Sequence, residues 1–248
     1  MLHFHNVSVA LGRQQILNNI RFSLPPGELS VLVGENGSGK STLLSCVNQQ
    51  LRYGGTISLK DADISRLSPK ERAKQIGYLP QKLPFPHITT EELVSFGRNP
   101  YLDFTGRLTD TDRELILAAL IDADAAHLSG RYVDTLSGGE QQRVALAMIL
   151  AQNTPILLLD EPTSHMDQRH EDGFLAQLSK LKGSKTILVV LHDMTTAMAY
   201  ADHMIVLNDG ALVFDGSKEE CLQKEIIETT FHLKRYTFED GKIFFGSK

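Results

Sequence analysis

The sequence predicts an α/β fold: a mostly parallel sheet, preceded by an antiparallel β-subdomain and interrupted by a helical subdomain. Three observations support it. An apolar run at residues 29–33 leads through a glycine-rich loop into a helical run at 42–47. Two further runs, 156–160 and 187–191, are continuously apolar over strand length, which is typical of parallel strands buried on both faces. Residues 84–155 carry mostly helical patterns instead.

The N-terminal elements read as antiparallel strands. Residues 2–10 alternate roughly between apolar and polar side chains, a second short run follows at 20–24, and a third stands at 56–59. Ser68 before Pro69 then predicts a helix start, with serine as the N-cap and proline at the first helical position. We expect a β-subdomain ahead of this helix.

The middle of the chain is expected to be helical after a short buried strand at 76–79. Thr111 and Glu114 have the spacing of a capping box, in which each residue satisfies a backbone N–H of the other. Ser137 and Glu140 repeat that spacing before a second apolar helical run. Each pair predicts the start of a helix.

These patterns divide the chain into four parts. Residues 1–83 form the first part of the core with the antiparallel β-subdomain, and 84–155 form the helical subdomain. Residues 156–216 complete the core and include a strand hairpin with a tight turn at Asn208-Asp209-Gly210. Residues 217–248 read as a short tail.

Composition limits the class of protein. The chain has 248 residues, which fit one large domain or a core with a subdomain, and 42% of them are apolar. Its two cysteines, Cys46 and Cys221, form no disulfide framework and suit a reducing compartment. A net charge of −5 without a basic run argues against nucleic acid as the main partner. Neither a signal peptide nor a membrane-spanning run is expected.

Residues 34–42 have the spacing G-x-x-x-x-G-K-[ST] of a phosphate-binding loop. Its glycines let backbone N–H groups surround phosphate oxygens, and the following helix adds its positive N-terminal end. Lys40 is expected to reach the β- and γ-phosphates, and the Ser41 hydroxyl to ligate Mg²⁺. A chance match is the alternative, and the strand before and helix after the loop argue against it. The nucleotide-binding candidates here are Gly34, Asn36, Gly37, Ser38, Gly39, Lys40, Ser41 and Thr42.

A second group of candidates follows the apolar run at 156–160. A strand that ends in a carboxylate presents it at the edge where ligands bind in open α/β sheets. Asp160 is therefore expected to hold Mg²⁺, and Glu161 to polarise the attacking water as a general base. A solvated acidic turn is the alternative, and the phosphate-binding loop upstream disfavours it.

The third group lies at 136–143, where Ser137, Gly138 and Gly139 open a helix. Exposed N–H groups and a serine hydroxyl at a helix start form an anion site. An ordinary capped helix explains the serine and Glu140 but not the paired glycines. Two phosphate-binding devices in one chain suggest that two chains meet head-to-tail, each offering its second device to the other's nucleotide.

These motifs together resemble the ATPase subunit of an ATP-binding-cassette (ABC) transporter. Glu140 stands where this family most often has glutamine. The resemblance implies a P-loop NTPase (RecA-like) core, ATP and Mg²⁺ as cofactors, and an ATP-sandwich homodimer. Six segments match family motifs, in family order: 34–42 (Walker A), Gln81 (Q-loop), 136–143 (signature), 156–161 (Walker B), 164–167 (D-loop) and His192 (switch histidine).

The resemblance also implies roles for the remaining residues. Gln81 would sense Mg²⁺ and the attacking water, and His192 would contact the γ-phosphate and orient Glu161 or the water. Asp167 would couple the two halves across the dimer. Leu11 stands where the family usually has an aromatic residue that stacks on adenine, so we expect only a modest preference for ATP over GTP. Competition of GTP against labelled ATP tests that expectation.

Three segments, 67–73, 95–101 and 146–155, resemble the ATPases of ferric-siderophore, haem and vitamin B12 importers. This implies ATP-driven import of an iron chelate through a membrane permease, together with a substrate-binding protein, at the cytoplasmic face of the inner membrane. Siderophore, haem and cobalamin all stay open as cargo. The alternatives are an ABC ATPase for another cargo, a soluble ABC-type ATPase that acts on DNA or ribosomes, and a regulatory subunit without turnover, against which Glu161 and His192 argue.

Overall fold

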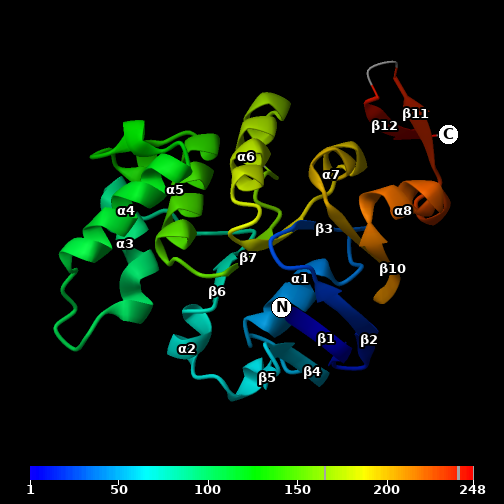
Figure 1. Cartoon of the computed structure of the whole chain (residues 1–248), viewed down its shortest axis with the longest axis horizontal. Helices are drawn as coiled ribbons and strands as arrows, with labels where there is room; N and C mark the ends of the chain where they lie inside the picture. Colours follow the sequence, from blue (N-terminus) through cyan, green and yellow to red (C-terminus); the bar gives the residue numbers. More distant parts are fainter. Residues whose placement is uncertain (165, 239–240, 248) are drawn as a thin grey trace. The chain divides into compact units, whose positions relative to one another are not determined.

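The chain divides into two units, and the first of them is made from both ends of the sequence (Figure 1). The computed structural model describes residues 1–164, 166–238 and 241–247. Unit 1 comprises Met1–Arg66 and Thr186–Lys248, and unit 2 comprises Leu67–Lys185. The boundaries predicted from the sequence, at 83/84, 155/156 and 216/217, remain proposals for subdomain limits.

The N-terminal strands of unit 1 form an antiparallel sheet, as the sequence predicts. The strand order is β2-β1-β4-β5. Alternate residues of β1, among them Leu2 and Phe4, are fully or almost fully buried, and this alternation sets the register. The strands are β1 (Leu2–Leu11), β2 (Gln14–Leu24), β4 (Gly54–Leu59) and β5 (Ala62–Asp63).

A second sheet in unit 1 carries the phosphate-binding loop. Strand β3 (Leu29–Gly34) pairs in parallel with β8 (Thr186–Val190) and with β9 (His203–Asn208). Every residue of β3 and β8 is buried, which explains their continuous apolar runs. Strand β10 (Ala211–Ser217) pairs antiparallel with β9 across Asp209 and Gly210, whose φ angles of 47° and 73° confirm the predicted tight turn.

Helices and a hairpin complete unit 1. Cys46 lies in helix α1 and is fully buried, and its burial raises the pKa of its thiol to about 12, so it acts as the small apolar residue that the sequence suggests. Residues 217–248, expected to be a short tail, contain two helices and a hairpin whose strands pair from Leu233 to Thr237. The elements are α1 (Lys40–Val47), the 3₁₀ turn η1 (Ile64–Arg66), α7 (Met194–Tyr200), α8 (Lys218–Gln223), α9 (Ile226–Thr230), β11 (Leu233–Thr237) and β12 (Ile243–Ser247).

Unit 2 contains a parallel strand pair and a group of helices. Strands β6 (Ile76–Leu79) and β7 (Ile156–Asp160) pair in parallel. Helices α3, α4 and α5 pack on one another, as Figure 1 shows, so the helical character predicted for 84–155 is confirmed. The helices are α2 (Pro69–Ala73), α3 (Thr90–Ser95), α4 (Asp110–Asp122), α5 (Gly138–Ala151) and α6 (Gln168–Lys180), with 3₁₀ turns η2 (Phe96–Tyr101), η3 (Ala126–Leu128) and η4 (Val133–Thr135).

The predicted helix starts are right at two positions and wrong at one. Ser68 caps α2 and Ser137 caps α5, each in a complete capping box. The expected cap at Thr111 is wrong, because α4 begins earlier and Thr109 caps it. Asp112, three residues after Thr109, accepts the reciprocal bond from the Thr109 N–H at 2.9 Å. The acidic residue of this capping box is therefore Asp112, and not Glu114 as the sequence predicted.

A buried ion pair ties η2 to the helices of unit 2. Arg98 Nε donates to Asp112 Oδ1 at 2.8 Å, and Arg98 Nη1 donates to the carbonyl of Ala151 at 2.7 Å. The Tyr101 hydroxyl donates to the carbonyl of Gln152 at 3.0 Å. A Cβ at Gly97 would lie 2.1 Å from the carbonyl oxygen of Met148, so only glycine fits there. The segment 95–101 therefore fastens α4 and α5 together.

Candidate functional site

The phosphate-binding loop joins β3 to α1, and the structure explains why three of its positions are glycine. Gly37 and Gly39 have φ angles of 85° and 98°, in the left-handed region that side chains disfavour. A Cβ at Gly34 would lie 2.4 Å from the carbonyl oxygen of Leu207 and 2.5 Å from the hydroxyl of Ser38. Gly39 is also the N-cap of α1, so its turn aims the helix N-terminus at the loop.

Lys40 lies across this loop. It is 5% exposed, and its Nζ donates to the carbonyl oxygens of Gly34 and Glu35, both at 2.9 Å. The hydroxyl of Ser38 is buried and has no hydrogen-bond partner among the described residues. A buried hydroxyl and a buried ammonium in one loop suit an anionic ligand, because each offers donors to its oxygens.

In unit 2, β7 delivers the two acidic candidates. Asp160 ends the strand and is 2% exposed, and Glu161 follows it at 7% exposed. Glu161 has a φ of 49°, a left-handed conformation that costs about 1–2 kcal/mol for a residue with a side chain. Strain of this kind gathers at functional sites. Gln81 Nε2 donates to Glu161 Oε2 at 2.5 Å, so the structure brings these two candidates into direct contact.

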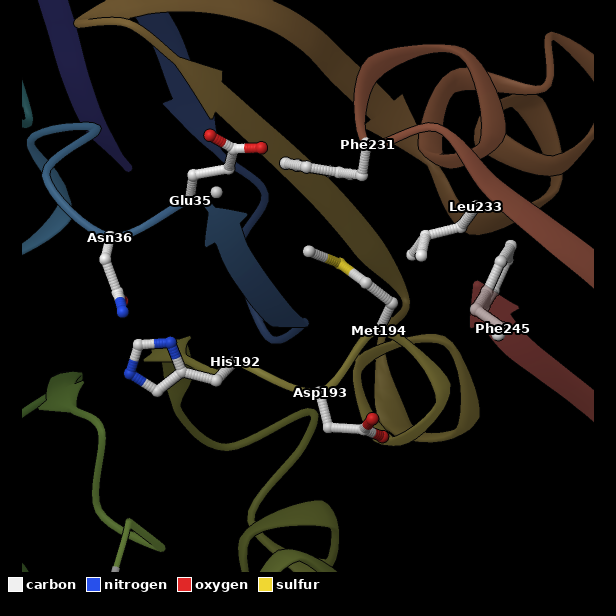
Figure 2. A pocket seen from close by; sticks show the side chains of 10 residues that line it. Glu35, Asn36, His192, Asp193, Met194, Phe231, Leu233 and Phe245 are labelled. Carbon is white, nitrogen blue, oxygen red and sulfur yellow. The ribbon is translucent and has the colours of Figure 1, made fainter. Parts of the chain in front are cut away.

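His192 lies two residues beyond β8 in unit 1. It lines a cavity of about 590 Å³ together with the first residues of the phosphate-binding loop (Figure 2). Asp193 caps α7 by accepting the N–H of Thr196 at 2.6 Å. The full lining is Gly34, Glu35, Asn36, His192, Asp193, Met194, Phe231, Leu233, Phe245 and Gly246.

The apolar wall of this cavity was not predicted from the sequence. Phe231, Leu233 and Phe245 come from residues expected to be a tail, and no motif marks them. Met194 follows His192 by two residues and faces the same cavity. The only indication in the sequence that residues 217–248 pack against the core is their content of aromatic residues.

The signature segment starts α5. The Ser137 hydroxyl and N–H both donate to Glu140 Oε2, at 2.7 and 2.8 Å. These bonds, with the positive charge of Arg131 nearby, hold the pKa of Glu140 below its ordinary value. Glu140 thus has a structural role that a glutamine also fills.

The paired glycines of the signature are not required by the fold. Neither Gly138 nor Gly139 has a positive φ. A Cβ at Gly138 would meet no atom within 4 Å among the described residues, and one at Gly139 would make only ordinary contact with His170, at 3.8 Å. Glycine in a helix costs about 0.5–1 kcal/mol relative to alanine. Such positions favour close approach of a ligand or another chain.

Two candidates lie away from these contacts. Asp167 caps α6 and accepts from His170, through its N–H at 2.9 Å and its Nδ1 at 2.8 Å, and these bonds lower the pKa of Asp167. His165, in the same predicted D-loop, is outside the described residues. Leu11 ends β1 and is 50% exposed, so it offers an apolar surface to a ligand.

The expected Mg²⁺ ligands have suitable chemistry. A serine hydroxyl, an amide oxygen and a carboxylate, from Ser41, Gln81 and Asp160, are the hard oxygen donors that Mg²⁺ prefers. The described residues contain no cluster of three or more His, Cys, Asp or Glu side chains arranged for a metal ion. Mg²⁺ is usually held by one or two carboxylates together with water and substrate phosphates. Among the described residues, no helix is long and apolar enough to cross a bilayer.

The chain is similar to known proteins over most of its length. A family model described as ABC transporter matches residues 17–164. The chain is 36% identical to the iron(3+)-hydroxamate import ATP-binding protein FhuC of Bacillus subtilis, over 94% of this chain and 88% of FhuC. It is 40% identical to the hemin import ATP-binding protein HmuV of Nocardia farcinica, over 88% of this chain and 76% of HmuV. The dimeric ATP-binding cassette MJ0796 with ADP and Pi aligns with a TM-score of 0.74 and 29% identity, over 88% of this chain and 99% of that one.

Proposed function

The chain belongs to the ABC transporter family and is an ATPase, and from this premise we propose that it powers import of an iron chelate through a membrane permease. The observation that carries the proposal is the match, over most of the chain, to proteins named for iron(3+)-hydroxamate and hemin import. A ferric siderophore or haem is therefore the cargo that we favour. Cobalamin stays an alternative, supported only by the sequence resemblance.

Lys40 and the phosphate-binding loop hold ATP. Its β- and γ-phosphates replace the carbonyls of Gly34 and Glu35 as partners of the Lys40 ammonium, and the Ser38 hydroxyl gains an oxygen partner. Ser41, Gln81 and Asp160 would hold Mg²⁺, which would supply positive charge beside the phosphates. Leu11 covers the base by apolar contact, which discriminates weakly between adenine and guanine.

Glu161 polarises the attacking water. Its contact with Gln81 supports this role, because a base must be held in one orientation to act on a water. His192 contacts the terminal phosphate and orients Glu161 or the water. The strained backbone of Glu161 supports the same assignment.

Two copies enclose each ATP. Ser137, Gly138 and Gly139 of one copy contact the nucleotide held by the loop of the other, and Asp167 couples the two halves. The glycines that the fold itself does not require support this arrangement, as does similarity to a dimeric cassette. Closure and opening of the pair move the permease. The chain acts as a peripheral subunit at the cytoplasmic face of the inner membrane. A substrate-binding protein belongs to the same system.

Reconstitution tests this function. The chain is combined in proteoliposomes with a membrane permease that co-purifies with it, and a ferric hydroxamate, hemin and cobalamin are offered separately with ATP. We expect ATP-dependent uptake of a ferric hydroxamate or hemin, and we expect Lys40→Ala to reduce it. Uptake of cobalamin alone would show that cobalamin, and not a ferric siderophore or haem, is the cargo. ATP hydrolysis that drives uptake of none of the three would favour a different cargo, or an ATPase that acts on DNA or ribosomes.

A second measurement tests the dimer. Activity per molecule is expected to fall on dilution, as the pair dissociates. Full activity at concentrations where sedimentation finds only monomers would contradict the shared site.

A further inference from the structure

The C-terminal hairpin contacts the helix that follows His192. Strand β12 packs against α7, and the N–H of Phe245 donates to the hydroxyl oxygen of Thr195 at 3.1 Å. Phe245 is only 6% exposed, so its ring is part of the packed interior of unit 1. These residues are 50 positions apart in the sequence, and nothing in the motif pattern links them.

Leu233 and Phe245 of the same hairpin, with Phe231 at the end of α9, form the apolar end of the cavity that His192 lines. In Figure 2, Asn36 and His192 lie at one end of this cavity, and Phe231, Leu233 and Phe245 lie at the other. Met194 is drawn between the two groups. The C-terminal segment and the His192 segment thus share one packed surface.

His192 lies in the short connection between β8 and α7, and different contacts hold the two ends of this connection. Before it, the N–H of Leu191 donates to the carbonyl of Leu32 at 3.2 Å, which extends the pairing of β8 with β3. After it comes α7, which has seven residues. A helix this short does not hold itself, and its position depends on what it packs against. The contacts of α7 therefore set where the connection ends.

We infer that the β11–β12 hairpin positions His192, and that Thr195 is the positioning residue through which it acts. The hairpin fixes α7 through the bond from Phe245 to Thr195, and α7 fixes the imidazole three residues earlier. This inference rests on the proposed role of His192 at the terminal phosphate. Thr195 is not among the residues that line the cavity beside His192, so its expected effect is on the position of His192.

The competing explanation is that the hairpin only completes the core of unit 1. In that case, loss of the bond lowers the thermal stability of the protein and leaves turnover unchanged. The two explanations differ in the turnover number at a temperature where every variant is folded, and in whether the effect depends on His192.

Thr195→Val tests the inference, because it removes the hydroxyl and keeps the shape. We expect kcat for ATP to fall about three- to tenfold, the range that corresponds to loss of one hydrogen bond, while KM changes less than about twofold. Thr195→Ser restores the acceptor and should restore kcat. Thr56→Val, on β4 and outside both α7 and the hairpin, is the matched control and should behave as wild type. If Thr195→Val does not fold, Thr195→Ala is judged by the same criteria.

The double variant with His192→Ala completes the test. If Thr195 acts through His192, Thr195→Val has less than about a twofold effect in that background, since neighbouring changes that share one path are not additive. If Thr195→Val lowers kcat by the same factor in the His192→Ala background as in wild type, the inference is overturned. Wild-type kcat in the single Thr195→Val variant also overturns it. Neither result affects the proposed function. Wild-type kcat in His192→Ala overturns both the inference and the proposed role of His192 on which it rests.

Discussion

Gln81 donates a hydrogen bond to the carboxylate of Glu161, at the end of the strand that carries Asp160. One oxygen of Glu161 is thereby occupied, which orients the other. Asp160 ends the strand, whereas Glu161 has a left-handed backbone and lies outside it. Adjacent carboxylates thus stand on different backbone conformations, which suits their proposed separate roles as metal ligand and general base.

Glu161→Gln is expected to lower the turnover of ATP by roughly 10²- to 10⁴-fold, the usual effect of losing a positioned base. ATP binding should persist, because glutamine keeps the size of the side chain and none of the phosphate-loop contacts change. Single-turnover hydrolysis and nucleotide affinity measure the two effects separately. Glu114→Gln, on the exposed side of α4, is the control. Near-normal hydrolysis in Glu161→Gln would refute the assignment of the base.

Lys40→Ala is expected to weaken nucleotide binding itself, by about 10- to 100-fold, which corresponds to the loss of a charge-assisted hydrogen bond of about 1.5–3 kcal/mol. The buried position of Lys40 in the loop places its ammonium where phosphates enter. Titration calorimetry with a non-hydrolysable ATP analogue measures this. Lys180→Ala, on an exposed face of α6, should bind as wild type. Unchanged affinity in Lys40→Ala would show that the loop does not hold the phosphates.

Local signals in the sequence were sufficient for most elements. Continuous apolar runs predicted β3, β7 and β8, and the box formed by Ser137 and Glu140 predicted the start of α5, because each depends on residues a few positions apart. The left-handed conformation of Glu161 was not predictable, since no glycine or asparagine marks it. Arg98 with Asp112, and Thr195 with Phe245, were missed because these contacts join separate elements.

Arg98→Leu is expected to lower the free energy of unfolding by about 3–5 kcal/mol, because the variant leaves the Asp112 carboxylate buried without its cation. The two side chains are only 6% and 9% exposed. Arg113→Leu is a matched control: its partner Asp110 lies 3.9 Å away, and both side chains are largely exposed, so the change should cost less than about 1 kcal/mol. Urea unfolding measures both. Equal effects of the two variants would show that burial of the Arg98 pair adds nothing.

The capping box of the signature helix predicts how the effect of Glu140→Gln on the free energy of unfolding depends on pH. The hydrogen bonds from Ser137, and the nearby Arg131, lower the pKa of Glu140 from its ordinary 4.5. A carboxylate with a lowered pKa contributes stability that is fully present above the ordinary value and is lost as the pH falls through the folded one. Wild type should therefore exceed Glu140→Gln in unfolding free energy at pH 7, and this difference should shrink as the pH falls below about 4.5.

Urea unfolding of both proteins at a series of pH values measures that difference. Glu114→Gln is again the control, because the exposed Glu114 lies outside the capping boxes of the described helices, and its difference from wild type should stay small throughout. A gap between wild type and Glu140→Gln that stayed constant down to about pH 3 would mean that packing of the side chain, and not its charge, holds Ser137 at the start of α5. The serine that we expect to meet the partner's nucleotide would then be held in place independently of pH.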